Sequence, residues 1–548
     1  MADLFQDYPL KAAWDEMFDA TGRPRASSEA VHDVVRMLPS DELRARADAL
    51  ALSFLDRGVT FALGGEERPF PLDIVPRIIT AEEWAVLSAG VAQRVRALEA
   101  FLADVYDSGQ IFADGVVPRR LIATSAHFHR AAADVTPANG VRVLVSGIDV
   151  IRDEAGEFRV LEDNIRTPSG VSYVIENRRA MTHGLPEAFS AHRIMPVSDY
   201  PQRLLAAARA AAPDGRADAE VVVLTPGIYN SAYFEHALLA RLMGVELVEG
   251  RDLVCRGNRV YMRTTSGEKR VDVIYRRIDD DFLDPLHFDS GSVIGCPGLL
   301  NAARDGGVTI CNAVGNGIAD DKLVYSYVPE MVRYYLSEEP LLKNVDTYRL
   351  DEPETMKWVL AHLGELVLKP VDASGGKGIV IGPRADADTL AELAVRVAAD
   401  PRGWIAQKVV QLSTVPTLID DQLRPRHVDL RPFALNDGKE IYVLPGGLTR
   451  VALPEGQLVV NSSQGGGSKD TWVLAGPDSD EEPAKPLVAE EPVQPSHRAP
   501  RGTTSTPGPR HLGAVPALHR QAAQQQQSQE QSQEQSQEQS QQQGSSSC

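Results

Sequence analysis

The chain has 548 residues, and 43% of them are hydrophobic, enough for roughly two to four packed units with buried cores. A formal net charge of −20 and an isoelectric point of about 5.1 argue against a nucleic-acid partner, which requires a basic surface. The four cysteines form no C-x-x-C pair, so neither a zinc ribbon nor a thioredoxin motif is indicated, and free thiols in a reducing cytoplasm are expected. The N-terminal MADLFQDYPL is acidic and has no long apolar run. No stretch approaches the ~18 apolar residues of a membrane span, so we expect a cytoplasmic protein with no membrane partner.

Residues 1–77 are predicted to be helical and irregular. Ser40–Asp56 has the charge and leucine pattern of an amphipathic helix, which Pro39 fits as a start. In Ile78–Asp107 we expect two further helices. The first would open with a capping box, with Thr80 as the N-cap and Glu83 three residues on.

Two strand patterns follow, VRVLVSGIDVIRD and EFRVLEDNI, with turn residues at Glu154–Gly156 between them. They predict an antiparallel hairpin that places Asp149 on the first strand. Glu162 and Asn164 lie two apart on the second strand, so both point to one face. Three converging oxygen ligands suit Mg²⁺, which prefers hard oxygen donors. A polar ladder facing solvent is the alternative, made less favourable by Asp149 thirteen residues upstream across a single hairpin.

Glu220–Ile318 alternates strand and helix patterns. VVVLTPGIYNS begins as a strand, Tyr233–Met243 is a helix, and VELVEGRDLV and VDVIYRRIDDDF are further strands. This alternation predicts a parallel sheet, whose ligands bind at the carboxyl ends of the strands. Arg276 and Arg277 lie at such an end and could read a carboxylate or phosphate bidentately, with ordinary surface charge as the alternative.

A strand ending at Cys311 leads into a Gly/Asn turn, and Asp320 and Asp321 can cap a helix that begins with Lys322. A lysine at a helix start is mildly unfavourable, because the helix N-terminus repels a cation. That misfit favours a ligand weakly, and a solvated surface lysine remains the alternative.

The stretch Glu365–Pro383, ELVLKPVDASGGKGIVIGP, predicts two strands around a Gly-rich loop. Gly375, Gly376 and Gly378 allow backbone N–H groups to approach an anion closely, and Lys369 and Lys377 supply positive charge beside Ser374. The loop lacks the spacing of a Walker loop or a Rossmann turn. Taken alone, it fits either a phosphate site or an ordinary hairpin.

Strand patterns continue through WIAQKVV, interrupted by Gln407 and Lys408, and through HVDLRPFAL, in which Asp429 and Arg431 share a face. GGLTRV contains Arg450, and Asn461 precedes the Gly-rich turn Gly465–Gly467. From about Ala475 the composition becomes Pro-, Glu- and Ser-rich and then Gln-rich, so residues 475–548 are predicted to be a disordered tail with no catalytic role.

Together these motifs resemble the ATP-grasp carboxylate–amine ligases. The strand lysine Lys369, the glycine flap Gly375–Gly378, the hinge strand Gln407–Val409 and the set Asp149, Glu162 and Asn164 carry the resemblance. DLRPF and the run of Arg450, Asn461 and Gly465–Gly467 are similar to glutathione-synthetase-type segments. The metal set ordinarily comes last but here comes first, which a circular permutation explains. The chain is therefore identified as a member of the circularly permuted type 2 ATP-grasp family, related to glutathionylspermidine synthase.

The resemblance implies an α/β (α+β) ATP-grasp fold. It divides the chain into a helical N-terminal region (1–77), a permuted segment with the metal hairpin (78–200), an α/β pre-ATP-grasp-like domain (201–320), the ATP-grasp lobes (321–474) and the tail (475–548). The oligomeric state stays open.

The resemblance also implies the chemistry. ATP would lie between two lobes, with Mg²⁺, as two ions, on Asp149, Glu162 and Asn164. A small-molecule or peptide carboxylate would form an acyl-phosphate, and an amine would displace phosphate. The implied catalytic residues are Arg431, Arg450 and Arg276. The implied ATP-binding residues are Lys322, Lys369, Ser374, Gly375, Gly376, Lys377, Gly378, Gln407, Lys408, Val409 and Asn461.

Two functions of other classes remain open. One is a non-catalytic ATP-binding scaffold that kept the cleft, against which the intact metal set argues. The other is a protein-kinase-like phosphotransferase, for which no H-R-D-x-x-x-x-N or D-F-G segment is present.

Overall fold

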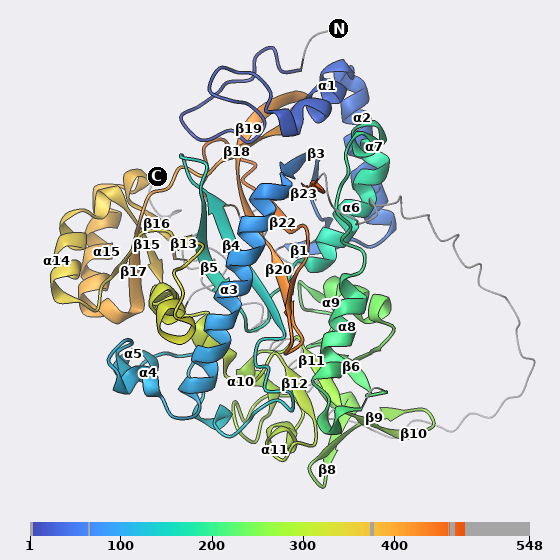
Figure 1. Cartoon of the computed structure of the whole chain (residues 1–548), viewed down its shortest axis with the longest axis vertical. Coiled ribbons are helices and arrows are strands. Elements are labelled where there is room, and N and C mark those ends of the chain that lie inside the picture. The colour runs from blue at the N-terminus through green and yellow to red at the C-terminus, as the bar shows by residue number, and fades with distance from the viewer. Residues whose placement is uncertain are drawn as a thin grey trace, which may run out of the picture.

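A computed structural model of the protein describes residues 4–63, 66–216, 218–372, 378–458, 460 and 466–476. The predicted loop residues Ser374, Gly375, Gly376 and Lys377, the predicted ATP ligand Asn461, and the tail after residue 476 lie outside these ranges. The described chain is a mixed α/β structure built around one large sheet, with a smaller lobe on one side and an α/β unit at one end (Figure 1). Within these ranges, no helix has the length and apolar character needed to cross a membrane.

The central sheet contains ten strands within the described ranges. Its main path runs β13–β5–β4–β19–β22–β23–β3, β18 and β20 pair with β19 and β4 respectively, and β21 pairs with β20. The strands are β3 (Leu72–Ile79), β4 (Val145–Arg152), β5 (Phe158–Asn164), β13 (Lys343–Asn344), β18 (Thr414–Ile419), β19 (Gln422–Arg431), β20 (Phe433–Asn436), β21 (Ile441–Val443), β22 (Leu448–Val451) and β23 (Gly467–Val473). The predicted β4–β5 hairpin is confirmed, and it lies beside β19, which is far away in sequence.

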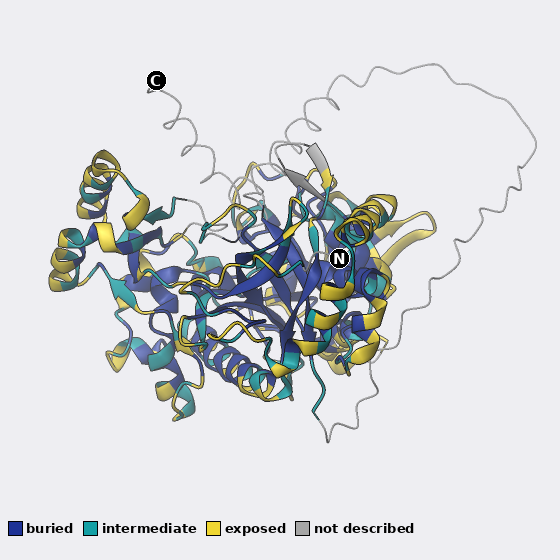
Figure 2. Cartoon of the chain, turned by 90° about the horizontal axis from the view of Figure 1, so that it is seen from above, coloured by how far each residue is buried: buried dark blue, intermediate teal, exposed yellow. Residues whose placement is uncertain are grey.

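The two faces of this sheet carry different side chains, because successive residues of a strand point to opposite faces. Val150 and Leu430 pair in register and belong to one apolar core with helix α3 (Ala81–Val105); we call this the α3 face. Asp149, Asp429 and Arg450 point to the other side, which we call the cleft face. Figure 2 shows the strands of the sheet buried between the exposed outer surfaces of the helices.

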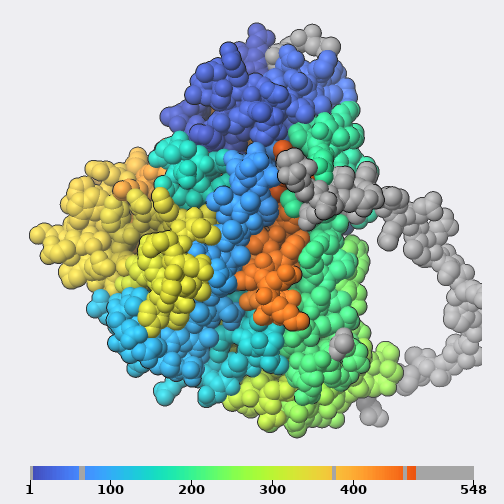
Figure 3. Space-filling model, in the orientation of Figure 1, coloured from blue at the N-terminus to red at the C-terminus, as the bar shows by residue number. Residues whose placement is uncertain are grey.

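On the cleft face, helix α6 (Val171–Gly184) packs against β22 and β23. The rest of that face lies opposite the smaller lobe, a four-stranded antiparallel sheet in the order β14–β17–β15–β16. Its strands are β14 (Thr347–Arg349), β15 (Leu366–Pro370), β16 (Val380–Ile381) and β17 (Trp404–Lys408), and its helices are α14 (Pro353–Ala361) and α15 (Ala387–Ala399). This lobe has its own small apolar core and protrudes beside the sheet (Figure 3).

The α/β unit contains the predicted parallel sheet, in the order β12–β11–β6–β7. Its strands are β6 (Val221–Leu224), β7 (Glu246–Val248), β11 (Val273–Arg276) and β12 (Thr309–Cys311), and its helices include α8 (Tyr200–Ala210), α9 (Tyr233–Met243) and α11 (Leu299–Arg304). The single strand predicted in VELVEGRDLV is wrong, because a short turn at Gly250–Asp252 divides β7 from β8 (Leu253–Arg256). Strand β8 forms a separate antiparallel sheet with β9 (Arg259–Thr264) and β10 (Gly267–Val271).

The N-terminal region contains more strand than predicted. Besides α1 (Glu29–Met37) and the predicted helix α2 (Ser40–Asp56), it has β1 (Thr60–Leu63), β2 (Glu66–Pro69) and β3. The boundary expected after residue 77 falls inside β3, which pairs in parallel with β23 at the edge of the central sheet.

The two helices predicted within Ile78–Asp107 are a single helix, α3. It begins with the predicted capping box, because Thr80 and Glu83 bond each other's backbone N–H groups. Gly90 does not break it. The missing Cβ of Gly90 leaves the space that the Leu342 side chain fills, since a Cβ there would lie 2.3 Å from Leu342 Cγ. The remaining short helices are α4 (Gln110–Ala113), α5 (Arg119–Ala123), α7 (Pro186–Ala191), α10 (Asp280–Leu283), α12 (Lys322–Tyr325) and α13 (Val328–Met331).

Candidate functional site

A cleft separates the cleft face of the central sheet from the four-stranded lobe. The cleft is open to solvent, and its lining combines many apolar side chains with a few charged ones, as is usual for a small-molecule site. Most of the predicted site residues that the structure describes line it. The polar lining residues are Asp149, Glu162, Lys322, Lys369, Gln407, Lys408, Asp429 and Arg450.

One part of the cleft is apolar. The lining residues Ile151, Leu161, Val345, Val410, Leu412, Leu458 and Val460 form a small cluster of their own with Ala452. The hinge strand β17 and Val409 border this part. The Gln407 side chain is turned away to donate to Thr347 Oγ1, and Lys408 Nζ lies 3.0 Å from Asp346 at the surface. An apolar pocket of this kind suits a flat, weakly polar ring.

Two lysines supply positive charge to the cleft. Lys369, on β15, is almost fully buried. Burial and, less strongly, the charge of Lys322 lower its pKa to about 8, against the opposing pull of Glu162 and Asp149. Lys322 opens α12, whose predicted cap is confirmed because Asp321 accepts from the N–H groups of Leu323 and Val324. Lys322 Nζ lies 3.7 Å from Glu162.

A buried cluster of two carboxylates and two arginines lies on the cleft face. Asp149 accepts from Arg431 Nε at 2.5 Å and Nη2 at 2.8 Å, and from Arg450 Nη2 at 2.6 Å. Asp429 holds Arg450 from the neighbouring strand, with both oxygens 3.0 Å from Nε. The cluster contains two negative and two positive groups, so its formal charges cancel.

The two carboxylates of this cluster differ in their pKa. Burial would raise the pKa of Asp149, but Arg431 and Arg450 outweigh it and hold that pKa below its ordinary value. Burial raises the pKa of Asp429 to about 6 despite the attraction of Arg450, and the charge of Asp149 adds to the rise. Asp149 therefore stays ionised at acidic pH, whereas Asp429 titrates close to neutrality.

The three predicted metal ligands share one face of the hairpin. In the register of the hairpin, Asp149 lies opposite Glu162 and Asn164 lies opposite Gly147. Glu162 is therefore next to the arginine cluster, 3.9 Å from Arg431. Glu162 retains 22% side-chain exposure, and its ion pairs with described residues are long, 3.7 Å to Lys322 and 3.9 Å to Arg431. The buried amide nitrogen of Asn164 has no hydrogen-bond partner among the described residues.

The donor chemistry fits a hard cation. Two carboxylates and one amide oxygen are the kind of ligands that Mg²⁺ accepts together with waters and substrate phosphates. In the described ranges no cluster of three or more His, Cys, Asp or Glu side chains stands ready as a complete metal cage. Glu162 is more open than Asp149, which is fully buried and already accepts from two arginines.

The structure does not bring Arg276 to this cleft. Its guanidinium is buried in the α/β unit, where it donates to the main-chain oxygens of Asn312 and Ala313 and pairs with Asp280 at 2.8 Å. These contacts join β11 to the turn after β12, and Arg276 does not line the cleft. Of the predicted flap, the described Gly378 has φ +65°, and a Cβ there would lie 2.9 Å from Pro370 Cγ, so this position requires glycine.

Two residues of the site were missed in the sequence. Asp429 shares a strand face with Arg431, but only its register opposite Arg450 shows it as a site residue. Gly147 lies under the Arg431 stem, since a Cβ there would be 3.0 Å from Arg431 Cδ. The D-x-R spacing was a usable signal for Asp429, whereas no local pattern marked Gly147.

Two lobes that enclose a cleft lined by a strand lysine, a hinge strand and an acidic hairpin define an ATP-grasp protein. The model of the family "Circularly permuted ATP-grasp type 2" matches residues 76–452, and the chain belongs to this family. The resemblance drawn from the motifs, including the permuted order, is thereby confirmed.

Several relatives share most of the chain. An uncharacterized protein of Mycobacterium tuberculosis is 61% identical over 465 residues, 84% of each chain. A protein of Frankia alni named "Putative glutamate--cysteine ligase 2-3" is 47% identical over 465 residues, which cover 84% of this chain but 54% of the Frankia protein. Among solved structures, a glutathione synthetase-like effector from Globodera pallida has the same fold, with a TM-score of 0.52 and 12% identity over 81% of this chain and 99% of that chain.

Proposed function

We propose that this protein is an ATP- and Mg²⁺-dependent carboxylate–amine ligase that acts through an acyl-phosphate. The observation that carries the proposal is the meeting of Lys322 and Lys369 with Asp149 and Glu162 in one cleft, from segments far apart in sequence. Two cations for phosphates, beside two carboxylates for a metal, are what phosphoryl transfer requires.

ATP would occupy the cleft with its adenine in the apolar part, against Val410, Leu412 and Val460. Backbone groups of Gln407, Lys408 and Val409 would read the adenine edge. Lys322 and Lys369 would attract the phosphates. Ser374, Gly375, Gly376, Lys377, Gly378 and Asn461 complete the proposed ATP site.

Asp149, Glu162 and Asn164 would hold Mg²⁺, which when bound neutralises charge developing on phosphate oxygens. The other steps depend on the substrates and on the arginines. A carboxylate oxygen of the first substrate attacks the γ-phosphorus and ADP leaves, which gives the acyl-phosphate. The amine nitrogen of the second substrate then attacks the carbonyl carbon, phosphate leaves, and the nitrogen loses a proton.

Arg431 and Arg450 would stabilise the negative charge on the acyl-phosphate and on the tetrahedral oxyanion. Both guanidiniums are already fixed by Asp149, and Arg450 also by Asp429. Such preorganised donors need not reorient during the reaction.

The name of the Frankia protein suggests one substrate pair to test, L-glutamate with L-cysteine. That name describes a protein of which this chain spans about half, so the activity could belong to the other half. A panel of amino acids, short peptides and amines is therefore needed alongside that pair.

Phosphate release with Mg²⁺ and ATP tests the proposal. A ligase releases phosphate rapidly only when a carboxylate and an amine are both present, and a stoichiometric amide accompanies it. ATP binding without amide formation over the whole panel would favour the non-catalytic scaffold. Transfer of the γ-phosphate to a protein hydroxyl would favour a kinase-like phosphotransferase instead.

A further inference from the structure

A segment outside the family match is built into the central sheet. Residues around Glu16 precede the matched range 76–452, yet they run alongside Thr414, just beyond the cleft residue Leu412. Glu16 N donates to Thr414 O at 2.9 Å, and Thr414 N donates to Trp14 O at 2.8 Å. The side chain of Glu16 is 4% exposed.

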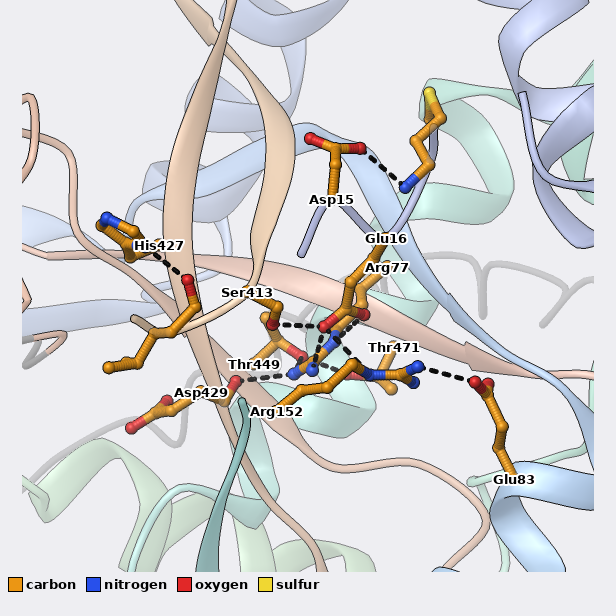
Figure 4. Close-up of polar contacts among 12 residues, drawn as sticks. Asp15, Glu16, Arg77, Glu83, Arg152, Ser413, His427, Asp429, Thr449 and Thr471 are labelled. Atoms are coloured by element: carbon orange, nitrogen blue, oxygen red, sulfur yellow. Dashed lines mark hydrogen bonds and ion pairs between the residues drawn. The ribbon is translucent and has the colours of Figure 1, made fainter. Parts of the chain in front are cut away.

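Glu16 forms a bidentate ion pair with Arg77 of β3, as Figure 4 shows. Arg77 Nε lies 2.8 Å and Nη2 2.6 Å from the two carboxylate oxygens, and Arg77 is fully buried. The third guanidinium nitrogen, Nη1, donates to the main-chain oxygen of Asp429 at 2.9 Å and to Thr449 Oγ1 at 3.5 Å. Arg77 thus reaches from β3 across β23 and β22 to β19.

The contact with Asp429 joins the two faces of the sheet. Thr449 and Leu430 pair in register on the α3 face, so Arg77 lies on that face. The side chain of Asp429 points to the cleft face, where it holds Arg450. Glu16 therefore fixes, through Arg77, the backbone of the residue that orients a cleft arginine.

The charges around Glu16 keep it ionised. Burial would raise its pKa, but Arg77 and Arg152 outweigh burial and lower that pKa to about 2. Arg152 is in turn bound by Glu83 of α3 at 2.7 Å, and Ser413 Oγ donates to Glu16 at 2.5 Å. The ion pair is thus intact throughout the neutral range.

The same segment also supports the hairpin of the cleft. The Trp14 ring lies against Gly156 at the β4–β5 turn, because a Cβ there would be 2.9 Å from three ring carbons. Residues 14–16 therefore support both the strand that carries Asp429 and the hairpin that carries Asp149.

We propose that Glu16 is a positioning residue of the cleft, which acts through Arg77 to hold Asp429 and hence Arg450 in place. The N-terminal segment is then a functional part of the site rather than an appendage to the matched family region. The catalytic consequence rests on the proposed function, whereas the structural coupling does not.

Hydrogen–deuterium exchange without nucleotide tests the coupling itself. Glu16→Gln removes the charge and keeps the shape. Asp470→Asn is the matched control. Asp470, on β23, is an equally buried carboxylate that pairs with Arg178 of α6, and it does not line the cleft. We expect faster exchange in residues 428–431 and 448–451 for E16Q but not for D470N. Unchanged exchange in E16Q, or the same increase in D470N, would overturn the proposal.

Kinetics test the consequence. We expect kcat to fall about tenfold in E16Q, the size of a lost charge-assisted contact, while KM for ATP stays within about twofold, because the adenine pocket is untouched. A fall of kcat in D470N as large as in E16Q would indicate general loosening and overturn the proposal.

If E16Q does not fold, Ser413→Ala replaces it in both experiments, because this change removes one hydrogen-bond donor to Glu16. We then expect smaller increases in exchange in residues 428–431 and 448–451 and a smaller fall in kcat. A wild-type protein that does not turn over ATP would refute the proposed function, and the exchange comparison alone would then decide the role of Glu16.

Discussion

The carboxylate of Asp149 accepts a 2.6 Å hydrogen bond from Arg450, 301 positions further along the chain. The same carboxylate accepts from Arg431, so one buried anion organises two buried cations. Glu162, directly opposite on the hairpin, has no such close ion pair with any residue that the structure describes. Asp149 and Glu162, which the sequence places in one set of metal ligands, therefore have different structural roles: Asp149 fixes the two arginines, and Glu162 does not.

Asp149→Asn should destabilise the fold as well as the reaction. It leaves two buried arginines short of one negative charge, and breaking a buried ion pair typically costs about 3–5 kcal/mol. Denaturant unfolding should show this loss. A D149N protein as stable as wild type would mean that the arginines find other partners.

Glu162→Gln should spare the fold and remove the reaction. The ion pairs of Glu162 with described residues are long, so little is lost by neutralising it, while a neutral amide is a poorer ligand for a hard dication. We expect the rate of Mg²⁺-dependent phosphate release to fall by a factor on the order of 100, which corresponds to about 2.7 kcal/mol. The melting temperature should be unchanged. Glu157→Gln on the same hairpin, away from the cleft, is the control and should remain active.

Lys369→Ala should weaken ATP binding by about 1.5–3 kcal/mol, the range for a hydrogen bond to a charged group. Calorimetry of nucleotide binding measures this directly. Lys408→Ala, which removes a surface lysine at the cleft edge, should have a smaller effect. Equal affinities for K369A and wild type would remove Lys369 from the ATP site.

ATP affinity should depend on pH through the same lysine. With a pKa of about 8, Lys369 is charged below pH 8 and loses its proton as the pH rises through that value. Affinity should therefore be highest below pH 8 and fall between about pH 8 and 9, because the neutral amine no longer attracts phosphate. Lys369→Arg, which stays charged, should flatten the profile.

Truncation after Gly476 should leave the melting temperature and ATP affinity unchanged, because the polar sequence beyond it supplies little apolar surface to bury. The cut cannot be made before residue 475. Ala475 N donates to Arg193 O, and Leu474 bridges to Ile194. A drop of many degrees on truncation after Gly476 would show that the removed residues pack on the body.

Local patterns predicted the hairpin, the α/β unit and the caps at Thr80 and Asp321. The β4–β5 hairpin was readable because both strands and their turn lie within one short stretch, so the polar face followed from simple alternation. The same holds for α9, whose predicted bounds Tyr233–Met243 are those observed.

Strand β3 could not be read in this way. Its sequence LDIVPRII contains Pro76 and the charged Asp73 and Arg77, and proline argues against a strand inside a sheet. Here β3 is an edge strand, and the ladder shifts register between Lys469 and Thr471 of its partner. Arg77 pairs with Glu16, and Asp73 pairs with Lys469. Both partners lie far from β3 in the sequence, so the local sequence could not show that these charges are neutralised.

The position of Arg276 could not be predicted from the sequence either. Two arginines after an apolar strand are typical of an anion site, and the sequence alone could not show that main-chain oxygens of Asn312 and Ala313 already take the donors of Arg276. Cleft membership likewise depended on strand order, which joins β4 to β19 across the permutation.

The pairing of β3 with β23 sets an order of events during synthesis. Pro71 and Ser468, which share a hydrogen bond at this edge, are 397 positions apart, so β3 leaves the ribosome long before the one strand that pairs with it in the described chain. Until β23 has been synthesised, the apolar residues Ile74, Val75 and Ile79 of β3 have no strand to pair with, and such an exposed apolar strand is prone to aggregation. Closure of such a distant contact is slow. This edge of the central sheet therefore closes only after Val473 has been added, as one of the last pairings of the described chain to form during synthesis.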